Sequence, residues 1–339
     1  SISIAIFFKQ RTIENLSICL KQKTETAMLI KNVVVPIEQQ HLSFAQERLW
    51  FIEKYEQGTN AYNIPMVFKL SGNAKVEILE QSFKTIVSRH EVLRSVIKED
   101  SEGRGYQLLL NEQEYPLAID RIMVTDKQQL DQELTKLVNH VYDSSSEYPI
   151  RVCLYELIGS SNNRKQKRNN ISGTKDSTEY YLSIVIHHIA FDGWSTEVLL
   201  KELQTCYSYY LAQSKGLPAK LDLPVLCIQY KDFAIWQKSY LSGERLAKQL
   251  SYWRNKLDGY ETLNLITDKR RPVQIDYSGR DIFFVLDKEI SGKLRELARE
   301  LKVSLYSVLL SGYYLMLRAY SNQDDIVIGV ATSNRNYKQ

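Results

Sequence analysis

Two adjacent histidines end an apolar run whose composition is typical of a buried β-strand. Residues 180–188 read YYLSIVIHH, and the chain continues as IAFDGWS. An imidazole titrates near neutral pH, so a histidine that a substrate can reach is able to accept or donate a proton. Asp192 follows His188 by four residues, and Gly193 comes next, where a helix is expected to begin. This pattern indicates acid–base chemistry at a strand-to-helix junction.

The two histidines are expected to have different environments. Successive side chains of a strand point to opposite faces, so His188 shares a face with Ile186, while His187 shares one with Val185. His188 is nearer the open end of the strand and is therefore the candidate catalytic residue. His187 is expected to be a packed, hydrogen-bonded partner that supports the site.

Asp192 has three open roles. It can orient His188, pair with an arginine, or start the following helix. A buried carboxylate without a cation or several donors costs several kcal/mol, so we favour an arginine partner. Backbone N–H groups around Gly193 are candidates for stabilising an oxyanion, because helix N-termini favour negative charge.

Five motifs occur in a fixed order along the chain. The segment from His187 to Gly193 matches HHxxxDG, and the others are LSFAQERLWF from Leu42, RHEVLRS from Arg89, YKDFAIWQ from Tyr230 and DDIVIGVATSNRN from Asp324. Together they resemble the core motifs of condensation domains of non-ribosomal peptide synthetases, in the chloramphenicol-acetyltransferase-like superfamily. The extended first motif resembles the subclass that uses an L-configured donor.

The resemblance implies amide bond formation between a donor thioester and the amine of an acceptor aminoacyl thioester. Both substrates would arrive on the phosphopantetheine arms of peptidyl carrier domains, next to an adenylation domain, and no cofactor or metal would bind directly. His188, Asp192 and Gly193 would be the catalytic set. Because the segment that contains Arg335 resembles a family motif, Arg335 is the expected partner of Asp192. Arg280 is the second candidate.

Two rival functions remain open. The first is a coenzyme A-dependent acyltransferase of the same superfamily, which a carrier-like helix at residues 7–20 argues against. The second is a non-catalytic condensation-like module that recruits partner enzymes, although such modules tend to have a degraded HHxxxDG motif. The histidine pair argues against heterocyclisation, whose domains carry aspartates there.

Irregular alternation of strands and helices favours an α/β sandwich over a helical bundle. The resemblance implies a two-lobed chloramphenicol-acetyltransferase-like fold whose second lobe is incomplete. The expected organisation is a carrier helix (1–20), a linker (21–40), a first lobe (41–215) and a second lobe (216–339). Strands are expected at 62–72, 92–97, 105–111, 115–124, 150–158, 180–188, 282–286 and 326–331. Helices are expected from Ser43 and at 75–90, 127–141, 196–212, 230–257, 289–301 and 305–319.

Composition limits the other classes of function. The 44 Lys and Arg residues balance 40 Asp and Glu, so no nucleic-acid partner is expected. No apolar run is long enough for a membrane span, and four scattered cysteines favour a reducing cytoplasm.

The polar stretch at 159–177 predicts a solvated loop. We interpret Arg89, Arg94, Tyr230, Asp232 and Trp236 as structural.

Overall fold

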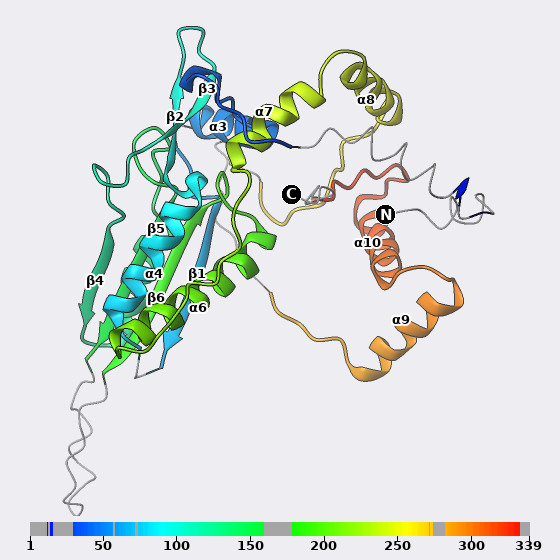
Figure 1. Ribbon diagram of the computed structural model, residues 1–339. Coiled ribbons are helices and arrows are strands. Elements are labelled where there is room, and N and C mark those ends of the chain that lie inside the picture. Colours follow the sequence, from blue (N-terminus) through cyan, green and yellow to red (C-terminus); the bar gives the residue numbers. More distant parts are fainter. Residues whose placement is uncertain are drawn as a thin grey trace, which may run out of the picture. The chain divides into compact units, whose positions relative to one another are not determined.

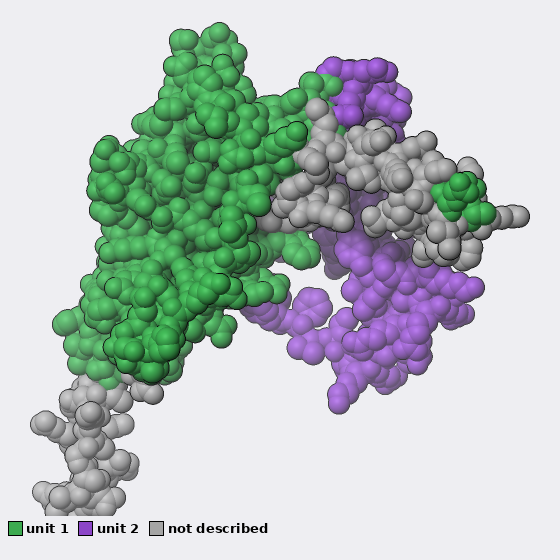
Figure 2. Space-filling model, viewed as in Figure 1, with its two compact units in different colours: residues 1–242, 335–339 green, residues 243–334 purple. Residues whose placement is uncertain are grey.

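The computed structural model describes residues 12, 14–15, 30–56, 58–71, 74–158, 178–270, 272–273 and 282–332. These residues form two compact units that meet in the chain between Ser242 and Gly243 (Figure 2). The division falls later than the lobe boundary expected after residue 215. The carrier-like helix at 7–20, apart from three residues, and the loop at 159–177 lie outside the described residues.

The first unit is built on a four-stranded sheet in the order β1-β6-β5-β4 (Figure 1). Strand β6 lies antiparallel to both neighbours, and β4 runs parallel to β5. A separate antiparallel pair is formed by β2 and β3. The strands are β1 (Asn63–Leu70), β2 (Ser95–Glu99), β3 (Gly105–Leu109), β4 (Ile119–Val124), β5 (Ile150–Leu157) and β6 (Glu179–His187).

The helices of this unit begin where the sequence supplies caps. Ser43 forms the predicted capping box with Gln46, in which each side chain bonds the other residue's backbone N–H. Asp126 and Asp192 cap α5 and α6. The helices are α3 (Phe44–Tyr55), α4 (Val76–Arg89), α5 (Lys127–Val138), α6 (Gly193–Ser214) and α7 (Tyr230–Tyr240), with short 3-10 turns η1 (Ile37–Gln39) and η2 (Glu91–Arg94).

Helices cover both faces of the larger sheet. The face that carries Ile184 and Ile186 packs with residues of α4 and α6, among them Phe83, which is 1% exposed. The opposite face carries Cys153 and Tyr155 and packs against α5. Burying one large apolar side chain stabilises the fold by about 1.5 to 3 kcal/mol. Strand β6 is thus held from both sides, which fixes the position of its end.

The chain segment around Val33, ahead of α3, is bound to α7. The Asp232 carboxylate is fully buried and accepts hydrogen bonds from the backbone N–H groups of Val33 (3.1 Å) and Gln229 (2.7 Å). Ile30 is buried nearby in the chain, with 6% exposure. The expected linker is therefore bound to the unit from about residue 30, ahead of the expected domain start at His41.

The second unit contains helices α8 (Gly243–Lys256), α9 (Lys288–Glu300) and α10 (Leu305–Ser321). The helical region expected at 230–257 is present but divided, because α7 ends at Tyr240 and α8 begins at Gly243. The strands expected at 282–286 and 326–331 are absent from the described residues. Ile282 and Phe283 are 86% and 93% exposed. An extended segment needs a hydrogen-bonded neighbour, and no strand lies beside these two in the described part of the chain.

None of the described helices combines the length and the hydropathy that crossing a bilayer requires. Within the same residues, no group of three or more His, Cys, Asp and Glu side chains is arranged to hold a metal ion.

Candidate active site

The histidine pair lies at the end of the central strand β6. The strand ends at His187, but the ladder continues for one residue, because the His188 N–H donates to the Tyr62 carbonyl oxygen over 2.8 Å. The His188 side chain is exposed. A reactant can therefore reach its ring at the point where the chain leaves the sheet.

His187 is a buried, neutral side chain. It is 2% exposed, and its backbone N–H donates to the Pro149 carbonyl over 2.8 Å. Its ring atom Nδ1 accepts a hydrogen bond from the Ile189 N–H (3.2 Å), so the neutral ring carries its proton on Nε2. Burial lowers the pKa of His187 to about 4, and the adjacent His188 contributes in the same direction. At neutral pH this ring fixes the turn after β6 and carries no charge.

Asp192 is the N-cap of α6. Its Oδ1 accepts hydrogen bonds from the Ser195 N–H (2.9 Å) and the Ser195 hydroxyl (2.5 Å). The structure thus shows the helix-starting role among the three that were open. The expected partners Arg335 and Arg280 lie outside the described residues.

Gly193 is the first residue of α6 and is exposed. It is not among the glycines with positive φ, and a Cβ built on it would meet no atom within 4 Å. Neither the turn nor packing within the described residues requires glycine there. The missing side chain leaves open space at the N-terminus of the helix, where backbone N–H groups point outward.

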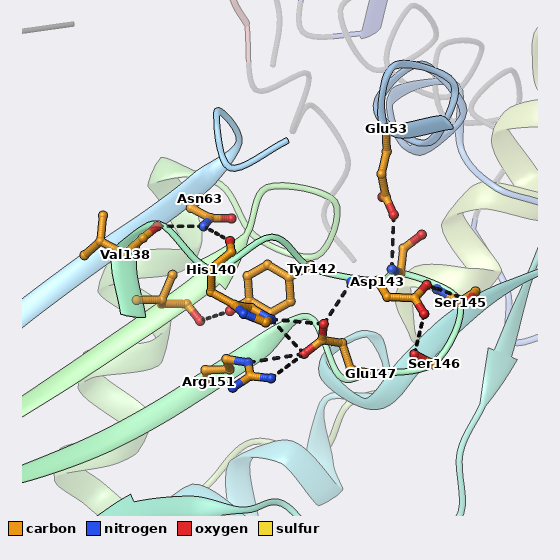
Figure 3. Close-up of polar contacts among 12 residues, drawn as sticks. Glu53, Asn63, Val138, His140, Tyr142, Asp143, Ser145, Ser146, Glu147 and Arg151 are labelled. Atoms are coloured by element: carbon orange, nitrogen blue, oxygen red, sulfur yellow. Dashed lines mark hydrogen bonds and ion pairs between the residues drawn. The ribbon is translucent and has the colours of Figure 1, made fainter. Parts of the chain in front are cut away.

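Sequence reasoning missed the segment that contains Tyr142, whose polar contacts Figure 3 shows and whose ring packs against His187. Tyr142 is 4% exposed, its ring lies edge-on to the His187 ring at 5.7 Å between centroids, and its hydroxyl donates to the Val185 carbonyl over 2.7 Å. On its other side it contacts the ring of His140, at 5.0 Å. The local sequence HVYDSSSEYPIR has no periodicity or motif that signals this contact.

Glu147 joins several donors of that segment. Its carboxylate accepts from His140 Nε2 (3.0 Å to each oxygen), from Arg151 Nη2 (2.9 Å) and from the Asp143 N–H (2.8 Å). Burial alone would raise the pKa of Glu147, but these three donors outweigh it and lower the pKa below its ordinary value. The carboxylate is therefore ionised at neutral pH.

The RHEVLRS motif has structural contacts. Arg89 Nε and His90 Nε2 bond the two oxygens of Glu202 on α6, at 3.2 and 2.7 Å. Arg94 donates to the Leu110 carbonyl over 2.8 Å. In the fourth motif, the Tyr230 hydroxyl bonds the Ser43 hydroxyl at 3.0 Å. These motifs connect α4, α6, α7 and the start of α3.

A hollow of about 880 Å³ opens elsewhere in the first unit, between α4, the later part of α6 and three loops. Thr85, Leu117, Tyr210 and Leu221 are among the residues that line it, and none of residues 187–195 does. It is therefore separate from the histidine pair.

Three comparisons relate the chain to known proteins. A family model described as "Condensation domain" matches residues 37–163 and 170–339. The chain is 38% identical over 299 residues to the N-(5-amino-5-carboxypentanoyl)-L-cysteinyl-D-valine synthase of Amycolatopsis lactamdurans, covering 88% of this chain and 7% of that protein. It is 33% identical to a linear gramicidin synthase of Brevibacillus parabrevis, covering 88% of this chain and 6% of that protein. The chain thus spans less than a tenth of these relatives.

The fold is shared with solved structures. The X-domain from teicoplanin biosynthesis superposes with a TM-score of 0.71 at 22% identity, over 86% of this chain and 59% of that one. This likeness concerns the fold alone. It confirms the expected α/β fold of the chloramphenicol-acetyltransferase-like type.

Proposed function

Because the chain belongs to the condensation-domain family, we propose that it forms amide bonds in a non-ribosomal peptide synthetase. The donor is an acyl or peptidyl thioester and the acceptor is an aminoacyl thioester, both held on the phosphopantetheine arms of carrier domains. The observation that carries the proposal is the exposed His188 at the open end of a buried strand, next to a neutral, fixed His187. The relatives named as synthetases support it.

In the proposed reaction, the acceptor nitrogen attacks the donor carbonyl carbon, a C–N bond forms, and the C–S bond then breaks. The proton lost by nitrogen ends on the departing sulfur as a thiol. An α-amine has an ordinary pKa of about 7.7 to 8.0, so an appreciable fraction is neutral near pH 7. His188 positions this amine and accepts its proton as the tetrahedral intermediate forms. The N–H groups of the first turn of α6, at Gly193, stabilise the oxyanion.

The proposal includes partners that the chain itself does not contain. Upstream and downstream carrier domains deliver the two thioesters, and an adenylation domain loads the acceptor carrier. No cofactor binds the chain directly in this scheme. Cys153, Cys206 and Cys227 are free thiols, which fits work in a reducing cytoplasm.

The test uses the full-length protein that carries this chain, with a loaded donor carrier and a loaded acceptor carrier. The expected result is a new amide on the acceptor carrier, detected by mass spectrometry of the released product. Acyl transfer from a soluble coenzyme A thioester to a soluble acceptor would support the rival acyltransferase. Carrier or enzyme binding without turnover would support a recruitment module. Either result would overturn the proposal.

A further inference from the structure

The segment between α5 and β5 crosses the end of the sheet on the face where His187 lies. It is held at its start and at its middle by hydrogen bonds to its backbone groups. The Asn63 amide on β1 donates to the Val138 and His140 carbonyls, at 2.8 and 2.7 Å (Figure 3). The Ser144 N–H donates to Glu53 on α3 over 3.1 Å. The segment therefore has a fixed path although it has no regular secondary structure.

A close approach of backbone adds to this fixation. Gly58 has a φ of +95°, and a Cβ built on it would lie 2.7 Å from a methyl group of Val141. Only glycine satisfies both conditions without a shift of the chain. The loop before β1 and the crossing segment are thus packed directly against each other.

We infer that residues 138–151 form a brace that positions the histidine pair, with Tyr142 as the positioning residue and Glu147 as the group that holds the brace together. The inference rests on the proposed function, since the pair is the proposed catalytic centre. Tyr142 contacts β6 twice: its ring meets the ring of His187, and its hydroxyl bonds the backbone of Val185, two residues earlier. No other described tyrosine is hydrogen-bonded to β6 by its hydroxyl and in ring contact with His187.

The brace acts on His188 through the backbone. His187 is held by its N–H at Pro149, which belongs to the brace, by its Nδ1 at Ile189 and by its ring edge at Tyr142. His188 follows immediately, and its own N–H is bonded to Tyr62. A shift of the His187 ring therefore moves the Cα of His188, and misplacing a reacting group by about 1 Å can cost 10²-fold in rate.

The brace also keeps water from the His187 ring. The groups that face this ring are Tyr142 from the brace and Tyr62 from the loop before β1; His188, the next residue in the chain, acts on it electrostatically. Next to Tyr142 lies the ring of His140, which is hydrogen-bonded to Glu147, and Glu147 is paired with Arg151. Opening the Tyr142 position admits water to the ring and lets His187 take up a proton at a higher pH.

The experiment compares Tyr142→Leu with Tyr155→Leu. Tyr155 is a matched control, because it is also a buried tyrosine (1% exposed) on the same face of the sheet but packs in the cluster against α5, away from His187. Each variant is made in the full-length protein for amide formation, and in the 339-residue chain for NMR with labelled histidines. The chain has five histidines, so single substitutions assign every ring signal.

Tyr142→Leu is expected to lower kcat by about 10- to 100-fold with little change in KM. Its His187 signal should titrate nearer pH 6.5 than pH 4. Tyr142→Phe, which keeps the ring, should have a kcat within about threefold of the parent's, and its His187 should titrate near the parent's pH. Tyr155→Leu should lose thermal stability without moving the His187 titration. Equal losses of kcat in the two leucine variants, or a His187 titration that stays near pH 4 in Tyr142→Leu, would overturn the inference. Because the titration needs no turnover, it reports on the brace even if the parent forms no amide.

Discussion

The two sides of the larger sheet contain the same three kinds of group in different settings. On one face, Glu202 joins Arg89 and His90 between α4 and α6, and its side chain is 9% exposed. On the other, Glu147 joins Arg151 and His140 in the brace behind His187, and its side chain is 24% exposed. The first set ties helices together and the second supports a single strand end. Chemical identity alone therefore does not tell a structural cluster from one that supports a site.

The largest expected effect belongs to His188, which strand alternation assigns to the α4–α6 face. His188→Ala in the full-length protein should lower the rate of amide formation by about 10²- to 10⁴-fold while leaving folding and carrier binding nearly unchanged. His187→Ala should appear first as a loss of thermal stability, because it leaves a void and an unpaired Ile189 N–H. Single-turnover assays with melting curves check both. Full activity in His188→Ala would contradict the face assignment and the catalytic assignment together.

Glu202→Gln is expected to lower the stability of the fold. The change leaves Arg89 and His90 without their shared carboxylate, at a cost of about 2 to 3 kcal/mol in the free energy of unfolding, below the fully buried range because the Arg89 and His90 side chains are partly exposed. Burial raises the pKa of Glu202, but His90 and Arg89 outweigh it and lower the pKa overall. This stabilisation is therefore present above the carboxyl's ordinary pKa of about 4.5 and is lost as the pH falls through and below that value. Urea unfolding at pH 7 and pH 4 measures both quantities. A variant as stable as the parent at pH 7 would show that the cluster does not hold α4 to α6.

On the opposite face, His187 gives stability a different pH dependence. Its pKa is lowered to about 4 in the folded chain, whereas the unfolded chain takes up the proton near pH 6.5. The stability that its neutral ring contributes is complete above pH 6.5 and is lost as the pH falls to about 4, by up to about 3 kcal/mol. His187→Gln should remove this slope between pH 6.5 and 4. An unchanged slope in that variant would assign the effect to other groups.

The smallest effect concerns the charge at the start of α6. Asn is as good an N-cap as Asp, so Asp192→Asn keeps the cap on Ser195 and removes only the negative charge. We propose that this charge pairs with Arg335. If it does, Asp192→Asn and Arg335→Ala should each lower the unfolding free energy by about 1 kcal/mol, and the double variant should lose less than the sum. Additive losses in a double-mutant cycle would exclude the pair.

The sequence predicted the parts of the site that depend on local pattern. An apolar run predicts the strand that ends in the histidine pair, and Ser43 with Gln46 predicts the start of α3, because both signals act over a few residues. Tyr142 was not predicted, because its contact with His187 joins residues 45 positions apart across irregular chain. The strand expected at 282–286 failed for a related reason. Its apolar residues favour an extended, buried segment. They do not identify the strand that would pair with it.

The bond between Asp232 and Val33 sets the length of chain from which a preceding domain can move. Fixing the chain at Val33 in place of His41 removes eight residues of free tether, or about 27 Å of fully extended length. For a flexible tether longer than the distance it must span, the effective concentration of an attached group falls roughly as the −3/2 power of tether length. In the proposed function, the buried Asp232 carboxylate thereby raises the effective concentration of a donor carrier attached ahead of this unit.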